Sequence, residues 1–205
     1  MAKRFLFQRL LKEGIEEGFK PGETQEAKEW FRDKAAQLKD VRPDRLMTRP
    51  GAKKVAYFWR PGEMYLFQYR PKEYLNEKQP YHDRFPLIML LNQHSAGWFE
   101  GINFHYLPYE FRAQLLDRMY RFRNSDDVMN TNYRLQTLTW HKLIRRFGGK
   151  ELHTPCVKRY INNNVRGRFI KIHPAEWDLA IMLPIERFRG ASRNKVWMQS
   201  RQKFQ

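Results

Sequence analysis

Hydrophobic residues recur with two different periods along this chain, and the first quarter shows the spacing of helices. Apolar side chains over residues 3–18 lie three and four positions apart, and the same spacing returns after Thr24. Gly18, Pro21 and Gly22 separate the two segments and interrupt a continuous helix. We therefore expect a helical hairpin whose second helix has its N-cap at Thr24. The first helix would carry Phe7, Leu10, Leu11 and Ile15 on one apolar face, and the second would carry Ala27, Trp30, Phe31, Ala35 and Leu38 at the same spacing; the hairpin either packs on the main domain or projects towards a partner.

A period of two, which is typical of strands, follows the helical segments. It is shown by Val55–Trp59, Met64–Tyr69, Leu87–Asn92, Trp98–Phe104 and Arg168–His173. The first two segments flank a turn at 60–63 and are predicted to form a β-hairpin, as are the next two. Tyr65, Phe67 and Tyr69 would share one face of the sheet. The late strand is expected to close the sheet against an early one.

Helical spacing returns at three places among the strands. The predicted helices are one opened by Pro108, one over Leu135–Phe147 after a polar loop at 124–132, and one opened by Pro174 and limited by Pro184. The apolar face of the first comprises Phe111, Leu115, Met119 and Phe122. Short antiparallel strands mixed with helices indicate an α+β fold. We expect a small antiparallel, partly open β-barrel-like sheet with flanking helices and an N-terminal helical hairpin.

Changes in composition suggest three parts of the chain. Residues 1–42 would form the helical hairpin, which is expected to serve assembly because its charge is nearly balanced. Residues 43–190 would form the α+β core domain. Residues 191–205 would form a basic C-terminal tail, which either docks in a neighbouring subunit or folds back on its own domain.

The chain combines a strong positive charge with the apolar content of a folded protein. It has 39 Lys and Arg against 22 Asp and Glu, a net charge of +17, and 15% aromatic residues. Disordered basic tails are poor in large apolar side chains, so the charge belongs to a folded domain. Such a surface indicates a polyanionic partner, most often nucleic acid. An acidic protein partner, or a role in solubility alone, is the alternative.

The spacing of reactive side chains predicts no enzyme, no metal site and no cofactor. No two of the six histidines stand four residues apart as in helical zinc sites. Asp83, Glu100 and Glu110 can be combined on paper as ligands of a nuclease metal, but their spacing is that of ordinary surface charge. Cys156 is the single cysteine, which excludes an internal disulfide, and we expect it to be a buried, unreactive thiol.

The positive charge is concentrated towards the C-terminus. Residues 1–50 carry 12 basic and 9 acidic side chains, whereas residues 158–205 carry 11 basic and 3 acidic ones. We predict a DNA contact by a C-terminal basic block, which comprises Lys158, Arg159, Arg166, Arg168, Lys171, Arg187, Arg189, Arg193 and Lys195. On a regular strand, Arg166 and Arg168 would point to the same face.

Aromatic residues are interleaved with this block. They are Tyr160, Phe169 and Trp197. One interpretation is that they stack on bases exposed at a frayed DNA end. The other is that they belong to the core or anchor the tail.

Eight short strings between about residue 57 and residue 201 form a specific pattern. They are Met64–Tyr69, Tyr81–Leu87, Phe99–Pro108, Arg112–Asp117, Pro155–Tyr160, Arg166–Ile170, Glu176–Trp177 and Lys195–Trp197. In this order they resemble a virion protein family of T-even-like tailed phages and cyanophages, the DNA end protector proteins. The string Gly-Ile-Asn-Phe-His-Tyr-Leu-Pro at 101–108 is the most specific. It also has a structural explanation, with Gly101 allowing close backbone approach, Asn103 capping a turn and Pro108 starting a helix.

The resemblance implies a non-enzymatic virion protein, made in the host cytoplasm, that binds the end of packaged linear double-stranded DNA. Such a protein shields the DNA end from host exonuclease, and its further partners would be portal, neck or tail proteins or copies of itself. No DNA-contact residue carries over by position. The alternative is a structural connector of the neck, baseplate or head-completion complex. No membrane partner is expected, because the longest apolar stretches, Pro86–Leu91 and Leu179–Ile185, are too short to span a bilayer.

Overall fold

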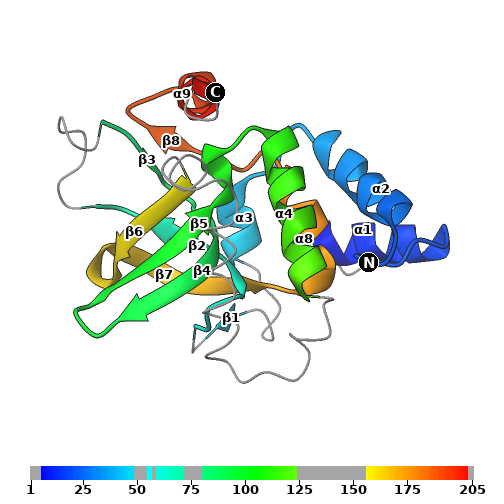
Figure 1. Cartoon of the computed structure of the whole chain (residues 1–205), viewed down its shortest axis with the longest axis horizontal. Coiled ribbons are helices and arrows are strands. Elements are labelled where there is room, and N and C mark those ends of the chain that lie inside the picture. Colours follow the sequence, from blue (N-terminus) through cyan, green and yellow to red (C-terminus); the bar gives the residue numbers. More distant parts are fainter. Residues whose placement is uncertain (1–5, 49–54, 57–58, 72–79, 124–155, 203–205) are drawn as a thin grey trace.

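The N-terminal segment forms the expected pair of helices. The computed structural model describes residues 6–48, 55–56, 59–71, 80–123 and 156–202 of the 205-residue chain. Helices α1 (Leu6–Glu16) and α2 (Gln25–Ala36) are joined by a short turn (Figure 1). The Thr24 hydroxyl caps α2 by accepting a hydrogen bond from the Ala27 N–H at 3.1 Å. The predicted loop at 124–132 and helix at Leu135–Phe147 lie outside the described residues.

The two helices of the hairpin pack closely because a glycine lies between them. A Cβ atom on Gly14 would lie 2.5 Å from Cζ of Phe31, so only glycine fits against this buried ring. Gly14 therefore takes the inward position one turn after Leu10. The prediction that Ile15 faces inward is wrong, because its side chain is 58% exposed.

Six strands form one antiparallel sheet in the order β1-β7-β2-β4-β5-β6. The strands are β1 (Val55–Ala56), β2 (Met64–Tyr69), β4 (Leu87–His94), β5 (Trp98–Asn103), β6 (Val157–Ile161) and β7 (Val165–Ile172). The predicted hairpin of β4 and β5 is confirmed. A separate two-stranded ribbon pairs β3 (His82–Asp83) with β8 (Phe188–Arg189).

The prediction that the segment beginning at Val55 forms a hairpin with β2 is wrong. Both edges of β2 are occupied, one by β4 and the other by β7. The turn at 60–63 instead extends the pairing of β2 with β4, since the Gly62 N–H donates to the Leu90 carbonyl at 2.8 Å. β7 is eight residues long and β1 is two, so β7 satisfies far more of the backbone groups of β2. The expectation that the late strand joins early ones is confirmed, with β7 between β1 and β2.

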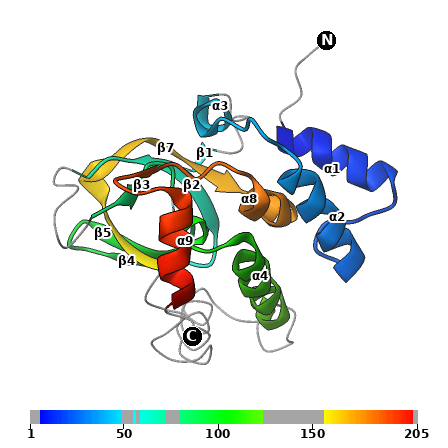
Figure 2. The same cartoon turned by 90° about the horizontal axis from the view of Figure 1, so that it is seen from above.

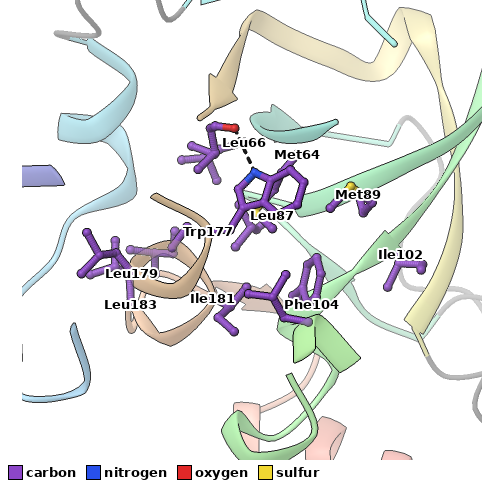
Figure 3. Close-up of a cluster of buried hydrophobic side chains, with 14 of the residues drawn as sticks. Met64, Leu66, Leu87, Met89, Ile102, Phe104, Trp177, Leu179, Ile181 and Leu183 are labelled. Atoms are coloured by element: carbon purple, nitrogen blue, oxygen red, sulfur yellow. Dashed lines mark hydrogen bonds between the residues drawn. The ribbon is translucent and has the colours of Figure 1, made fainter. Parts of the chain in front are cut away.

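The sheet buries hydrophobic side chains on both faces. On one face, residues of β2, β4 and β5 pack against the short helix α8 (Trp177–Met182) and its flanks (Figure 3). The Trp177 indole N–H donates to the Ile172 carbonyl at 3.1 Å, which fixes α8 to the end of β7. The other face is largely aromatic and comprises Tyr65, Phe67, Tyr69, Ile88, Leu90, Phe99, Tyr160 and Phe169. Tyr65, Phe67 and Tyr69 therefore share a face, as predicted.

The sheet curls around its aromatic face without closing. The ring centres of Phe99 on β5 and Phe169 on β7 lie 5.7 Å apart, although β2 and β4 separate these strands. The Tyr69 hydroxyl also accepts a hydrogen bond from the Ile161 N–H of the edge strand β6 at 3.2 Å. The α+β fold with a partly open, barrel-like sheet is thus confirmed.

Two further helical segments begin where prolines were expected to start them. Helix α4 (Tyr109–Arg123) follows Pro108, and a 3-10 turn (Pro174–Glu176) leads into α8, which ends before Pro184. Helix α3 (Pro43–Thr48) follows the hairpin, and 3-10 turns lie at Phe104–Tyr106 and Asn162–Asn164. Among the described residues, no helix has the length and apolar character needed to cross a membrane.

A buried ion-pair cluster connects α2 to α4 and α8. The Arg32 Nε donates to Asp178 Oδ1 at 2.7 Å, and its two terminal nitrogens bond the carboxylate of Asp117 at 3.0 and 2.8 Å. The helical hairpin is therefore packed on the sheet-bearing part of the chain. The division into residues 1–42, 43–190 and 191–205 remains a prediction.

The C-terminal tail folds back on its own chain as helix α9 (Arg193–Gln202). The Trp197 indole N–H donates to the His105 carbonyl at 2.9 Å, and the Ser200 hydroxyl donates to the Tyr106 carbonyl at 2.7 Å. Val196 is fully buried between these contacts. Of the two expected arrangements of the tail, the structure has the intramolecular one.

Candidate nucleic-acid interface

Two arginines at the start of β7 are accessible members of the C-terminal basic block. Arg166 and Arg168 are exposed, and neither forms a salt bridge with any described residue. Arg166 and Arg168 were expected to share a face because side chains alternate along a regular strand, but the strand is irregular at this point. Gly167 between them has φ of 75°, and between the pairs Leu66–Ile170 and Gln68–Arg166 one residue of β2 stands opposite three of β7. Extra residues of this kind are typical of a β-bulge, which bends the strand locally.

Arg159 lies over an aromatic ring on the neighbouring strand. Its guanidinium carbon is 4.1 Å from the ring centre of Trp98, and Nη2 is 3.5 Å from Glu100 Oε1. The other side of the indole is stacked on His94, with 3.3 Å between ring centres. Arg159 remains exposed, but part of its charge is offset by Glu100.

Two lysines of the block contact their own chain. Lys171 forms an ion pair with Glu63. Lys158 places its ammonium 4.2 Å from the ring centre of Tyr106, which is a cation–π contact. Both side chains are half-buried, so each offers less charge to a partner than its place in the sequence suggests.

Arg187 and Arg189 belong to the β3–β8 ribbon. The Arg187 guanidinium donates to the carbonyl oxygens of Pro184, Glu186 and Val41 at 3.0, 2.9 and 3.3 Å. Its charge is exposed, but two of these bonds fix the side chain to its own segment, and the bond to Val41 holds the α2–α3 connection against the chain before β8. Arg189 is exposed and stands opposite His82 in the ribbon.

Arg193 and Lys195 begin α9. Arg193 donates to the buried carboxylate of Glu186 at 3.0 Å and lies 4.8 Å from the ring centre of Trp197. Burial opposes ionisation of Glu186, but the charge of Arg112 and the hydrogen bond from Arg193 keep its pKa below the usual value. Lys195 is exposed and makes no salt bridge within the described residues.

The proposed stacking of Tyr160 and Phe169 on DNA bases is wrong. Both rings are only 4% exposed and pack within the aromatic face of the sheet. Burial raises the pKa of the Tyr160 hydroxyl well above its usual value. Trp197 anchors α9, so the interpretation of these aromatic residues as core and anchor is confirmed.

The structure adds two exposed arginines that the sequence analysis did not single out, Arg70 and Arg84. The Arg70 N–H donates to the Asn164 carbonyl at 2.9 Å, next to the start of β7. The Tyr69 N–H donates to the Arg84 carbonyl at 2.9 Å on the opposite side of β2. Each arginine follows a strand in the sequence, but only the strand order reveals that they lie beside the C-terminal basic block.

A buried carboxylate holds this region together. Asp83 Oδ2 lies 2.7 Å from His105 Nδ1 and accepts a hydrogen bond from the Asn103 amide at 3.2 Å. Asp83 Oδ1 accepts from the backbone N–H of Phe85 at 3.0 Å and of Arg187 at 3.5 Å. The β3–β8 ribbon is thus fixed to the end of β5 through one side chain.

The string at 101–108 has the structural role expected of it. A Cβ on Gly101 would lie 2.7 Å from Ile88 Cδ1 and 3.0 Å from the Met89 carbonyl oxygen, so glycine permits the close approach. The Asn103 side chain caps the following turn by accepting from the His105 N–H at 3.0 Å. Pro108 then precedes α4.

The acidic residues considered as metal ligands do not converge. Asp83 is buried against His105, Glu100 lies beside Arg159, and Glu110 pairs with Arg201. In the part of the chain that the structure describes, no three His, Cys, Asp or Glu side chains are arranged to hold a metal ion. Cys156 is buried, which raises the pKa of its thiol to about 12.

The basic surface agrees with a comparison against known families. The family model described as phage T4 terminal DNA protecting protein matches residues 6–202. The chain belongs to this family. Neither a curated protein nor a solved structure matches the chain.

Membership of the terminal DNA protecting protein family confirms the resemblance and extends it. The strings that carried the resemblance lie between about residues 57 and 201, whereas the family match begins within α1 and ends with α9. The helical hairpin is therefore part of the matched region. The family is one of phage proteins concerned with DNA ends, which agrees with the basic surface of this chain.

Proposed function

We propose that this chain is a non-enzymatic virion protein that binds the end of packaged linear double-stranded DNA and shields it from host exonuclease. The observation that carries the proposal is the match of residues 6–202 to a family of terminal DNA protecting proteins. The exposed arginines beside β2 and β7 supply the positive surface that such binding requires. The protein would be synthesised in the host cytoplasm and carried in the particle beside portal, neck or tail proteins.

Affinity would come from neutralising DNA phosphates with release of counterions. In the C-terminal basic block, Arg166, Arg168 and Lys195 are exposed without a salt bridge to described residues, so they are the first candidates for phosphate contact. Base stacking by Tyr160 or Phe169 is not available to provide end preference, because both are buried. Preference for an end would instead come from the shape that several copies of the chain enclose.

A second candidate function is a connector of the neck, baseplate or head-completion complex. It is favoured by the basic residues that already have acidic partners within the chain, such as Lys171 with Glu63 and Arg193 with Glu186. A chain that neutralises its own basic side chains in this way has fewer charges left for DNA. In this case the exposed arginines would contact acidic neighbours in the particle.

Exonuclease protection tests the proposed function directly. The protein is incubated with a linear duplex and a processive double-strand exonuclease, with closed circular duplex as competitor. We expect the linear duplex to survive, and an excess of circular DNA to reduce protection only weakly because it has no ends. Competition by circular DNA equal to that by linear DNA would contradict end binding. Absence of any salt-dependent DNA binding would favour the connector.

A further inference from the structure

Four short segments that are far apart in the sequence lie side by side at one end of the sheet, and together they carry six exposed arginines. We call these four segments the arginine rim; they are residues 68–71, 82–86, 164–168 and 186–190. Their basic residues other than histidine are Arg70, Arg84, Arg166, Arg168, Arg187 and Arg189, and all six are exposed. Half of the segments, and both Arg70 and Arg84, lie outside the C-terminal basic block.

Backbone hydrogen bonds place the four segments side by side. At the end of β2, the Arg70 N–H donates to the Asn164 carbonyl beside the start of β7. On its other side, the Tyr69 N–H donates to the Arg84 carbonyl of segment 82–86. The Arg84 N–H in turn donates to the Arg187 carbonyl at 2.9 Å. Neighbouring extended segments lie about 4.8 Å apart, so the four backbones together span about 15 Å. This width is comparable to that of a duplex groove and its flanking phosphates.

The accessible charge of the rim has a single sign. The acidic residues of the four segments are Asp83 and Glu186, and both are buried and bonded inward. Pairing in the ribbon also sets Arg84 directly opposite Arg187, since His82 stands opposite Arg189 and Asp83 opposite Phe188. Like charges placed opposite each other destabilise an antiparallel pair. An anion that binds between them removes this cost.

The pKa of the nearby His82 is affected by the positive charge of the rim. His82 is buried, and its pKa is lowered first by burial and then by the charges of Arg189 and Arg84, against the raising effect of Asp83. The charges of both arginines therefore reach the same point of the ribbon. A phosphate bound there would offset them.

The choice of arginine also indicates the occupant. All six basic residues of the rim are Arg, although the chain has Lys elsewhere. The planar guanidinium forms two parallel hydrogen bonds to phosphate, which the ammonium of Lys cannot do. Arg187 already uses its two terminal nitrogens on backbone carbonyls, which leaves five candidate phosphate ligands, Arg70, Arg84, Arg166, Arg168 and Arg189.

We infer that the arginine rim is the surface on which this protein holds the phosphates of duplex DNA, with Arg70 and Arg84 as essential members. The inference rests on the proposed function and adds to it a composite site. Arg193 and Lys195 on α9 lie outside the four segments; Arg193 is held by Glu186, and Lys195 would make a separate phosphate contact. In Figures 1 and 2 the β6–β7 turn and β3 lie towards one end of the molecule, and α1 and α2 lie at the other. The DNA would therefore bind at the end remote from the helical hairpin.

Binding of a linear duplex at several salt concentrations tests the site. The variant R70Q/R84Q removes two rim charges, and R9Q/K20Q removes two exposed charges at the opposite end as a matched control. We expect R70Q/R84Q to lower the salt slope by up to about 1.8, since each duplex phosphate contact contributes about 0.9, which corresponds to about a 60-fold loss of affinity at 0.1 M salt. The control should superimpose on the wild type.

A second measurement does not depend on how well a variant folds. In the wild-type protein, the pKa of His82 is followed by NMR with and without a saturating linear duplex. We expect the pKa to rise on binding, because phosphates offset the charges of Arg84 and Arg189. Tight binding by the wild type with an unchanged His82 pKa and an unaffected R70Q/R84Q would overturn the rim as the site while leaving DNA binding intact. Absence of salt-dependent binding by the wild type would overturn the proposed function itself.

Discussion

Replacing Arg32 by Met tests whether the helical hairpin is held on the sheet-bearing part of the chain by its buried ion pairs. Arg32 is only 5% exposed and bonds the carboxylates of Asp178 and Asp117. Methionine keeps much of the volume of the side chain but removes all five N–H donors. The buried carboxylate of Asp178 then keeps the hydrogen bond that it accepts from the Tyr120 hydroxyl at 3.0 Å.

The expected magnitude follows from the burial of the pair. Removing one partner of a buried salt bridge costs about 3–5 kcal/mol, because the remaining charge stays desolvated. Asp178 is as buried as Arg32, whereas Asp117 keeps some access to water, so we expect about 4 kcal/mol, in the middle of this range. In a domain of this size such a loss lowers the melting temperature by about 10 °C.

Urea unfolding of four proteins measures the effect and its cause. They are the wild type, R32M, D178N and R32M/D178N, with R9Q as an exposed control expected to change the free energy of unfolding by less than about 0.5 kcal/mol. In the double variant, neutral Asn at position 178 replaces the buried carboxylate that R32M leaves without its cation. The double variant should therefore be more stable than R32M alone. A cost below about 1 kcal/mol for R32M, or no relief from D178N, would refute the assignment of the stabilisation to this pair.

Further predictions concern the surface, the sheet and pH. R166Q/R168Q should lower the salt slope of duplex binding by up to about 1.8 and weaken all sequences alike, because phosphate contacts carry no base information; curves that superimpose on the wild type would mean that these residues face a protein. G101A should destabilise the protein by about 1–3 kcal/mol in urea unfolding, since the added methyl group overlaps the facing strand, and a neutral effect would contradict the close approach. I15E should leave stability and DNA affinity unchanged but impair incorporation into particles if the hairpin serves assembly; normal incorporation would argue against that role. Burial opposes ionisation of Asp117, yet the hydrogen bonds and the charge of Arg32 hold its pKa below the usual value. The contribution of Asp117 to stability should therefore be complete above about pH 4 and be lost as the pH falls through the lower pKa of the folded state. Urea unfolding of the wild type from pH 6 to pH 2 should show this loss, and D117N should lack it.

Local features of the fold were predictable because neighbouring residues determine them. The cap at Thr24, the hairpin of β4 and β5, and the helix after Pro108 depend on contacts within about fifteen residues. The pairing of β1 was not predictable in this way, because its partner lies more than a hundred residues later in β7. Ile15 was misplaced because the inward position depends on a close contact of Gly14 with Phe31, which periodicity does not record.

The candidate site shows the same limit. Charge density along the chain indicated Arg166 and Arg168, which the structure leaves exposed beside β2. It could not separate them from Arg187 and Arg193, whose guanidinium groups bond backbone carbonyls and Glu186 within the chain. It also passed over Arg84, because an isolated arginine becomes part of a surface only when strands from elsewhere are placed next to it.

The position of β7 between β1 and β2 has a consequence for the synthesis of the protein. β2 ends at residue 69 and β7 ends at residue 172, so at about 5–20 residues per second the ribosome needs roughly 5–20 s to deliver the missing strand. During this interval the edge of β2 and its aromatic side chains lack their partner, which makes this the step most exposed to aggregation or to capture by chaperones. Arg166 and Arg168 arrive with the same strand. A nascent or prematurely terminated chain that stops before β7 therefore lacks part of the arginine rim.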